Sequence, residues 1–284
     1  MSKVALVTDS TSYIPRDLKD QYPITVVPQV VIWEGQTYED DVTITPEQFY
    51  TRLRTAKVMP STSQVSVVNM HKAFSNLLEQ GYEVLGIFVS EKLSGTYQSA
   101  VQGREQLTSG QEKVDFINSE TTAMALGFMV LQVARAAVEG ASLAECRALA
   151  EKARQHVGVY LTVETLEFLH RGGRIGGAQR FLGTALNLKP ILAIQDGRVE
   201  PVERVRTRSK ALDRVVELVA EKCAGKSPVR MATLHADSEA DARIMLDKIS
   251  SQINPVESVF AAVSPAVGAH AGPGTVGLAW MAGM

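Results

Sequence analysis

Short apolar runs alternate with amphipathic stretches along the first half of the chain. Runs rich in Val and Ile predict buried β-strands at residues 3–7, 24–33, 82–89 and 114–117. Capping signals and apolar residues at helical spacing predict helices that begin near Thr45, Ser66, Ser94, Thr121 and Ser142. Because strands and helices alternate, we expect parallel strands with crossover helices on both faces of one sheet.

A second pattern begins near residue 157. Strand-like runs follow at residues 157–163, 189–194, 199–205, 229–234 and 258–262. Asp196-Gly197 predicts a hairpin, and helices are predicted over residues 209–223 and 237–253. A chain of 284 residues is long enough for about two domains. The predicted fold class is α/β, with a Rossmann-like parallel sheet in residues 1–157 and a mixed sheet with helices in residues 158–284.

Composition and charge are those of an ordinary globular protein. Hydrophobic residues make up 45% and charged residues 21% of the chain, and the net charge is −2. These values argue against a disordered acidic chain and against a general nucleic-acid binder. No apolar run is long enough for a membrane span or a signal peptide, and Cys146 and Cys223 are too few for a disulfide framework. We therefore expect a cytoplasmic protein.

Positive charge is concentrated in residues 171–210. This segment has nine Lys or Arg residues and three acidic residues, a net charge of +6, which leaves −8 for the rest of the chain. It is either a solvated basic face or a surface that binds an anion or a partner. Arg204, Arg206 and Arg208 alternate and are expected to share one face of a strand, as an exposed basic edge or a docking surface.

Common catalytic and cofactor motifs are absent or incomplete. Residues 272–277 spell G-x-G-x-x-G, but the seven residues that follow cannot supply the helix and acidic residue of a dinucleotide site. The sequence has no P-loop, no G-x-S-x-G, no H-E-x-x-H and no C-x-x-C, and its five histidines lack metal-ligand spacing. We expect no cofactor, no metal and no catalytic residue.

Polar residues gather where predicted strands lead into helices. Asp9-Ser10-Thr11 and Ser94-Gly95-Thr96 follow two strands of the parallel sheet, so they are expected to lie close together at its carboxyl edge. The free N–H groups of a helix start favour an anion there. Residues 60–66 contain four hydroxyl side chains, among them Thr62 and Ser63. One hydroxyl suffices as an N-cap, and the others are available to a ligand.

Two glycine-rich segments carry basic residues. Residues 170–177 contain four glycines, which let a backbone approach a ligand closely, together with Arg171 and Arg174, which favour a carboxylate or a phosphate. A plain flexible loop is the alternative for this segment. Residues 268–275 place His270 among small residues in a predicted loop, where a ligand can reach it.

These hydroxyls, the histidine and the arginines would hold an anion better than they would transform one. Apolar residues 124–130 and 185–192 are expected to line a hydrophobic pocket beside the anion. Two other functions stay open. A serine hydrolase would use Ser94 as nucleophile and His270 as base, with Asp9 as the orienting acid, although the nucleophile elbow is missing. A binding protein for another anionic metabolite would use the same polar residues without an apolar tunnel.

The order of these motifs resembles that of the DegV family. The matching segments run through the whole chain and are Thr8-Asp9-Ser10-Thr11, Thr62-Ser63-Gln64-x-Ser66, Ser94-Gly95-Thr96, Arg171-Gly172-Gly173-Arg174-Ile175, Leu188-Lys189-Pro190-Ile191-Leu192 and His270-x-Gly272-Pro273-Gly274. The resemblance implies a two-domain α/β protein that binds one long-chain fatty acid, of the palmitate, stearate or oleate class, in an apolar tunnel.

The same resemblance implies a partner. The chain would be the fatty-acid-binding subunit (FakB) of a bacterial fatty acid kinase, whose separate dihydroxyacetone-kinase-like subunit phosphorylates the bound carboxylate to an acyl phosphate. The chain itself would then be a carrier and not an enzyme, with at most transient membrane contact. The resemblance leaves open whether the product serves phospholipid metabolism or signalling.

Individual residues also acquire implied roles. Thr62, Ser94 and His270 would contact the carboxylate, and Arg171 and Arg174 would neutralise it. The residues that would surround this group are Asp9, Ser10, Ser63, Gly95 and Thr96. Arg204 or Arg206 would dock the kinase subunit. Val65 and Asn118 replace a proline and an aspartate that are usual in the family, so no chain length or unsaturation preference is implied.

Overall fold

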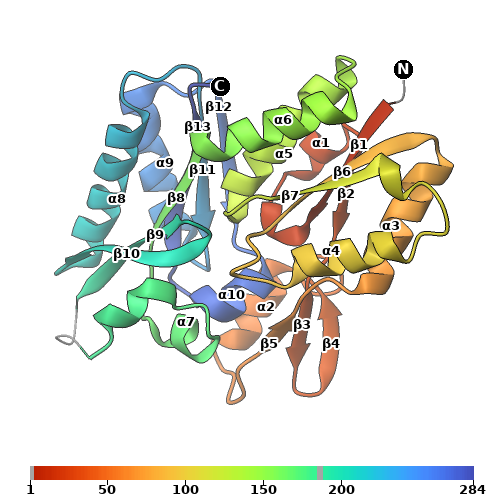
Figure 1. Cartoon of the computed structure of the whole chain (residues 1–284). Coiled ribbons are helices and arrows are strands. Elements are labelled where there is room, and N and C mark those ends of the chain that lie inside the picture. Colours follow the sequence, from red (N-terminus) through yellow and green to blue (C-terminus); the bar gives the residue numbers. More distant parts are fainter. Residues whose placement is uncertain (1–2, 184–187) are drawn as a thin grey trace.

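The computed structural model describes residues 3–183 and 188–284 of the chain (Figure 1). Its helices are α1 (Arg16–Lys19), α2 (Pro46–Leu53), α3 (Val67–Glu79), α4 (Thr96–Glu105), α5 (Ala123–Val138), α6 (Leu143–Ala153), α7 (Glu167–Arg171), α8 (Arg208–Cys223), α9 (Glu239–Ile253) and α10 (Pro265–Ala271). Its strands are β1 (Lys3–Asp9), β2 (Ile24–Val27), β3 (Val30–Trp33), β4 (Gln36–Glu39), β5 (Ser61–Ser63), β6 (Tyr82–Phe88), β7 (Val114–Asn118), β8 (Val157–Thr162), β9 (Lys189–Gln195), β10 (Arg198–Val205), β11 (Val229–His235), β12 (Glu257–Ala262) and β13 (Val276–Ala282).

The N-terminal sheet is parallel, as predicted. Its order is β2-β1-β6-β7, and each neighbouring pair is parallel. Helices α3 and α4 pack on one face, where Val7, Phe74 and Phe116 share an apolar cluster, and α5 and α6 pack on the other (Figure 1). The predicted helix starts at Thr45, Ser66 and Ser142 are confirmed, because each side chain accepts an N–H from the first turn of its helix.

The prediction of one strand over residues 24–33 is wrong. The run is divided between β2 in the parallel sheet and β3 in a separate antiparallel sheet of order β4-β3-β5. Pro28 lies at the break and has no N–H to donate to a strand ladder. This small sheet contains β5, the strand on which Thr62 lies.

The C-terminal sheet is mixed, as predicted. Its order is β10-β9-β8-β13-β11-β12, and β11-β12 is its one parallel pair within the described residues. Asp196 and Gly197 have positive φ angles and join β9 to β10 in the predicted hairpin. Helices α8 and α9 cover one face, and α5 contacts the other.

Helix α5 lies between the two large sheets, which explains its composition. It contacts β1 of the N-terminal sheet and β8 and β13 of the C-terminal sheet. A helix that is covered on opposite sides is apolar around its whole circumference. The prediction that residues 124–130 line a ligand pocket is therefore wrong, because they form the core between the sheets. Residues 185–187 of the second predicted lining segment lie outside the described residues.

Two elements near the C-terminus were not predicted. Strand β13 is the fourth strand of the mixed sheet and all seven of its residues are buried. Such a strand is a continuous apolar run without alternation. Helix α10 begins with Pro265 at its first position, a signal for a helix start. His270 consequently stands on a helix and not in the predicted loop.

The sheets change from one to the other between β7 and β8. All strands of the N-terminal sheet precede residue 119, and those of the mixed sheet begin at Val157. The domain boundary at residue 158 stays a prediction. Among the described helices, none combines the length and the apolar character that crossing a membrane requires.

Candidate functional site

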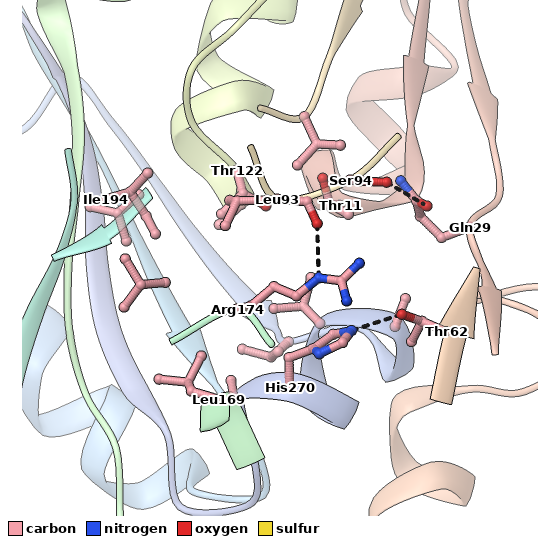
Figure 2. Close-up of a pocket in the computed structure, with 18 of the residues that line it drawn as sticks. Thr11, Gln29, Thr62, Leu93, Ser94, Thr122, Leu169, Arg174, Ile194 and His270 are labelled. Carbon is pink, nitrogen blue, oxygen red and sulfur yellow. Dashed lines mark hydrogen bonds between the residues drawn. The ribbon is translucent and has the colours of Figure 1, made fainter. Parts of the chain in front are cut away.

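A cavity of about 250 Å³ lies between the N-terminal and C-terminal sheets. Figure 2 shows hydroxyl, amide, imidazole and guanidinium groups at one end and aliphatic side chains at the other. The labelled polar residues are Thr11, Gln29, Thr62, Ser94, Thr122, Arg174 and His270. The aliphatic lining residues include Val159, Leu161, Leu169, Ile194, Val199 and Leu234. The cavity therefore suits a molecule with one polar end and one apolar end.

Ser94 and Gln29 form one wall of the polar end. Ser94 precedes α4, and its Oγ lies 2.9 Å from Thr96 Oγ1 and 3.5 Å from Gln29 Oε1. Gln29 Nε2 donates to Thr96 Oγ1 at 2.9 Å. Gly95 lets the Gln64 side chain pack closely here, because a Cβ atom at this position would lie 2.0 Å from Gln64 Oε1. These contacts hold the Ser94 hydroxyl at the start of a helix, where an anion is favoured.

His270 and Thr62 form the opposite wall. Nε2 of His270 and Oγ1 of Thr62 are hydrogen-bonded at 2.7 Å, whereas His270 Nδ1 is buried and has no hydrogen-bond partner in the described part of the chain. Burial, aided by the Arg174 charge, lowers the pKa of His270 to about 4, so the imidazole is neutral at physiological pH. Gly172 leaves room for this ring, because a Cβ atom there would lie 2.1 Å from Nδ1.

Arg174 brings a positive charge to the same end of the cavity. Its Nε donates to Leu93 O at 3.0 Å (Figure 2). Its Nη1 donates to Gly172 O at 2.8 Å. Both acceptors are neutral carbonyls, and no acidic side chain among residues 3–183 and 188–284 forms an ion pair with Arg174. A half-buried guanidinium without a counter-charge attracts an anion.

A second opening of about 280 Å³ adjoins the polar end. Thr62, Arg174 and His270 line both spaces, so they stand between the cavity and this opening. Arg171 lines only the second opening, where it pairs with Glu167 and its side chain is 61% exposed. The structure therefore separates the two predicted arginines: Arg174 reaches the cavity and Arg171 does not.

The predicted surrounding residues fall into two groups. Ser63 and Gly95 line the cavity. Asp9, Ser10 and Thr96 are buried behind its wall and do not line it. Asp9 accepts from Thr11 and from the Val89 N–H, and burial raises its pKa.

The expected proximity of the two polar tripeptides is confirmed. Gln29 connects them, because its backbone N–H donates to Ser10 Oγ at 3.0 Å while its side chain contacts Thr96 and Ser94. Ser10 in turn donates to the buried carboxylate of Asp40. Gln29 is the main polar residue of this cavity that the sequence did not reveal. A single amide side chain has no sequence pattern that marks it as part of a site. The neighbouring Pro28 indicates only that the strand is interrupted there.

Arg204 and Arg206 lie away from the cavity. Both are exposed, and the Arg204 guanidinium stacks on the Phe181 ring at 4.7 Å. The prediction that these residues and Arg208 share a strand face is wrong, because β10 ends at Val205. Arg208 belongs to α8 and pairs with Asp241 and Glu164.

The geometry gives no support to a serine hydrolase. The Ser94 hydroxyl contacts Gln29 and Thr96, whereas His270 contacts Thr62. Asp9 is bonded to Thr11 and Val89 and does not orient the histidine. Nucleophile, base and orienting acid thus lack the chain of hydrogen bonds that such a site uses. In the described residues, no group of His, Cys, Asp or Glu could hold a metal ion.

The low pKa of His270 predicts a pH dependence of stability. Folding keeps the imidazole neutral down to about pH 4, whereas the unfolded chain binds a proton near 6.5. The stabilisation from neutral His270 is complete above pH 6.5 and is lost as the pH falls towards 4. Burial of Asp40 raises its pKa to about 6 and opposes this trend. We expect the melting temperature difference between wild type and His270→Gln to shrink from neutral pH to about pH 4. A constant difference would contradict the assignment of a buried neutral imidazole.

Comparisons with known proteins agree with this geometry. The family model described as "Uncharacterised protein, DegV family" matches residues 3–283. A DegV domain-containing protein of Halalkalibacterium halodurans is 34% identical over 281 residues, which are 99% of each chain. The solved structure of a DegV family protein from Thermus thermophilus, which is described as fatty acid binding, has a TM-score of 0.92 and 34% identity over 99% of each chain. DegV of Bacillus subtilis, described as a fatty acid binding protein, has a TM-score of 0.90 and 30% identity over 99% of this chain and 100% of that one.

Proposed function

The chain belongs to the DegV family, and on this premise we propose that it binds one long-chain fatty acid and presents the carboxylate to a separate kinase. The observation that carries the proposal is the two-ended cavity, in which aliphatic side chains face Arg174, His270, Thr62 and Ser94. The family's solved members from Thermus thermophilus and Bacillus subtilis, which are described as fatty acid binding, support the choice of ligand.

The apolar end suits an acyl chain. Leu161, Leu169, Ile194 and Val199 come from the mixed sheet and the segment beside it, and they present aliphatic surface to the cavity. Each methylene that leaves water contributes about 0.8 kcal/mol. A long chain therefore supplies most of the binding energy, and it needs no specific polar contact.

The polar end suits one carboxylate. Arg174 supplies the charge, and the hydroxyls of Thr62 and Ser94 can each donate a hydrogen bond to a carboxylate oxygen. His270 is neutral, so it fixes Thr62 without adding a second permanent charge. Palmitate, stearate and oleate share this head group, and the proposal extends to that class and not to one member of it.

Extraction of the purified protein tests the ligand directly. The protein is denatured, extracted with organic solvent and examined by mass spectrometry. We expect about one fatty acid per chain. An empty extract, combined with no uptake of added oleate or palmitate, would reject the proposal and favour another anionic metabolite.

The two hydroxyls give a first test of the head-group assignment. Thr62→Ala and Ser94→Ala should each weaken oleate binding by about 1–2 kcal/mol, because each removes one hydrogen bond to a charged group. Isothermal titration with oleate measures this change. Ser61→Ala is the matched control, since Ser61 neighbours Thr62 on β5 but does not line the cavity. Equal affinity in both cavity variants and the control would reject the assignment.

Presentation to a kinase is supported by the surface around the polar end. The second opening leads to Thr62, Arg174 and His270, and Arg171 lines it with an exposed guanidinium. An acyl phosphate carries more negative charge than the acid, and the segment 171–210 has a net charge of +6. In this proposal the chain acts as a carrier and the dihydroxyacetone-kinase-like subunit supplies ATP and the phosphoryl transfer.

Arg204 and Arg206 test the docking surface. Arg204→Ala and Arg206→Ala should leave oleate affinity unchanged, because both residues lie outside the cavity. They should lower acyl phosphate formation when the kinase subunit and ATP are added, since exposed charges set the association rate. Arg243→Ala on α9 is the control, as its guanidinium is exposed and lies over Phe260. Loss of oleate binding in either test variant would place that arginine in the pocket instead.

A further inference from the structure

Asp40 is a buried carboxylate near the polar end of the cavity, although it does not line that cavity. Only 1% of the residue is exposed. Its Oδ2 accepts from Ser10 Oγ at 2.6 Å, and its Oδ1 accepts from the Ala266 N–H at 2.8 Å. Its own N–H donates to Gln29 O at 2.9 Å. One residue is thus bonded to three segments that are far apart in the sequence.

The bond to Ser10 leads to the Ser94 wall. Ser10 Oγ donates a hydrogen bond to Asp40 and accepts one from the backbone N–H of Gln29 at 3.0 Å. The Gln29 amide then contacts Ser94 at 3.5 Å. A carboxylate at position 40 can only accept, so the Ser10 hydroxyl donates to it and accepts the backbone N–H of Gln29.

The bond to Ala266 leads to the His270 wall. Ala266 lies in the first turn of α10, four residues before His270, so the two residues lie on one side of the helix. A seven-residue helix makes few internal hydrogen bonds and depends on tertiary contacts for its position. The Asp40 carboxylate supplies one such contact, and the bond from the Tyr50 hydroxyl to Val263 O supplies another just before the helix.

We propose that Asp40 is a positioning residue of the head-group site, which holds the Ser94 wall through Ser10 and Gln29 and the His270 wall through α10. The spacing between the two walls decides whether one carboxylate can bond to both, because a displacement of a few tenths of an ångström weakens a charge-assisted hydrogen bond. This inference deepens the proposed fatty-acid-binding function and rests on it.

Asp41 provides a matched control for this residue. It follows Asp40 directly, has a positive φ of 59° and does not accept from Ser10 or Ala266. Asn tolerates that backbone conformation, so Asp41→Asn removes a charge beside Asp40 and leaves the fold intact. Asp40→Asn keeps one acceptor oxygen for the Ala266 N–H but cannot also accept the Ser10 proton, whereas Asp40→Ala removes both acceptors.

The experiment combines two measurements on the full chain. Oleate affinity is measured by isothermal titration, and the pKa of His270 is measured in the ligand-free protein by NMR titration of its imidazole. Asp40→Ala should raise the oleate Kd about tenfold or more, because both walls lose the contact that holds them at the spacing that one carboxylate needs. It should also raise the His270 pKa from about 4 towards 6.5, since a displaced α10 exposes the imidazole to water. For Asp40→Asn, both the oleate Kd and the His270 pKa should lie between those of wild type and Asp40→Ala. For Asp41→Asn, both should equal the wild-type values.

The outcomes distinguish a positioning role of Asp40 from a purely structural one. A lower melting temperature with unchanged Kd and unchanged His270 pKa would overturn the positioning role and leave Asp40 a structural residue. If wild type binds no oleate while Asp40→Ala still moves the His270 pKa, the proposed function fails and the positioning of α10 by Asp40 stands. If Asp40→Ala does not fold, Ser10→Ala replaces it. That variant breaks only the Ser94 side, so the Kd should rise while the His270 pKa stays low, and an unchanged Kd would reject the proposal.

Discussion

Shortening the fatty acid from sixteen to ten carbons should weaken its binding by about 5 kcal/mol, which is between three and four orders of magnitude in Kd. The change removes six methylenes from the apolar end of the cavity, and each contributes about 0.8 kcal/mol on leaving water. The carboxylate is the same in both ligands, and so are its proposed contacts with Arg174, Thr62 and Ser94. A competition assay against a fluorescent fatty acid measures the whole series.

The series separates a fatty acid site from a site for another anionic metabolite. If the acyl chain lies along Leu161, Leu169 and Ile194, log Kd should fall almost linearly with chain length until the cavity is full. The methyl ester of the sixteen-carbon acid serves as the control, since it keeps the chain and loses the charge. Equal affinity for six-carbon and sixteen-carbon acids would show that the apolar end takes no part in binding.

Replacement of Arg174 by alanine should cost about 2 kcal/mol of fatty acid affinity, a loss of roughly 30-fold. The guanidinium is half-buried, its described acceptors are two neutral carbonyls, and it faces the polar end of the cavity. Its removal leaves a carboxylate with hydroxyl donors and a neutral His270 but without a counter-charge. Isothermal titration with oleate gives the difference.

Arg171→Ala is the matched control for Arg174→Ala. Arg171 lies three residues away, is exposed and already pairs with Glu167, so its loss should leave oleate affinity within about twofold of wild type. Arg174→Lys should recover only part of the lost affinity, because a lysine cannot donate to both Leu93 O and Gly172 O in the same fork geometry. A larger loss in Arg171→Ala than in Arg174→Ala would reverse the two roles.

Much of the fold follows from local patterns. Residues 84–89 are an apolar run, and a strand forms where such a run can be buried between helices. The start of α2 follows from Thr45, Pro46 and Gln48, whose capping contacts involve only neighbouring residues. The strand over residues 24–33 was predicted incorrectly because periodicity does not show that Pro28 sends the two halves to different sheets.

The sequence predicted which types of residue form the candidate site better than it predicted how they are arranged. Thr62, Ser94, Arg174 and His270 were named from motifs and do line the cavity. Arg171 was given the same role as Arg174, because both stand in one glycine-rich segment and the sequence cannot show that only one side chain turns inward. Gln29 was missed, since its partners Ser94 and Thr96 are more than sixty residues away.

The sequence by itself determined the elements and the chemistry of this protein. Its apolar periods and caps specify most strands and helices, and its hydroxyls, arginines and histidine predict an anion site, because these properties depend on residues close together in the chain. Only the tertiary structure decided which of those groups meet. The cavity lies between the N-terminal and C-terminal sheets, burial keeps His270 neutral, and Asp40 accepts a hydrogen bond from Ala266, which is more than two hundred residues away. Burial and long-range hydrogen bonds depend on the whole fold, and no local pattern contains them.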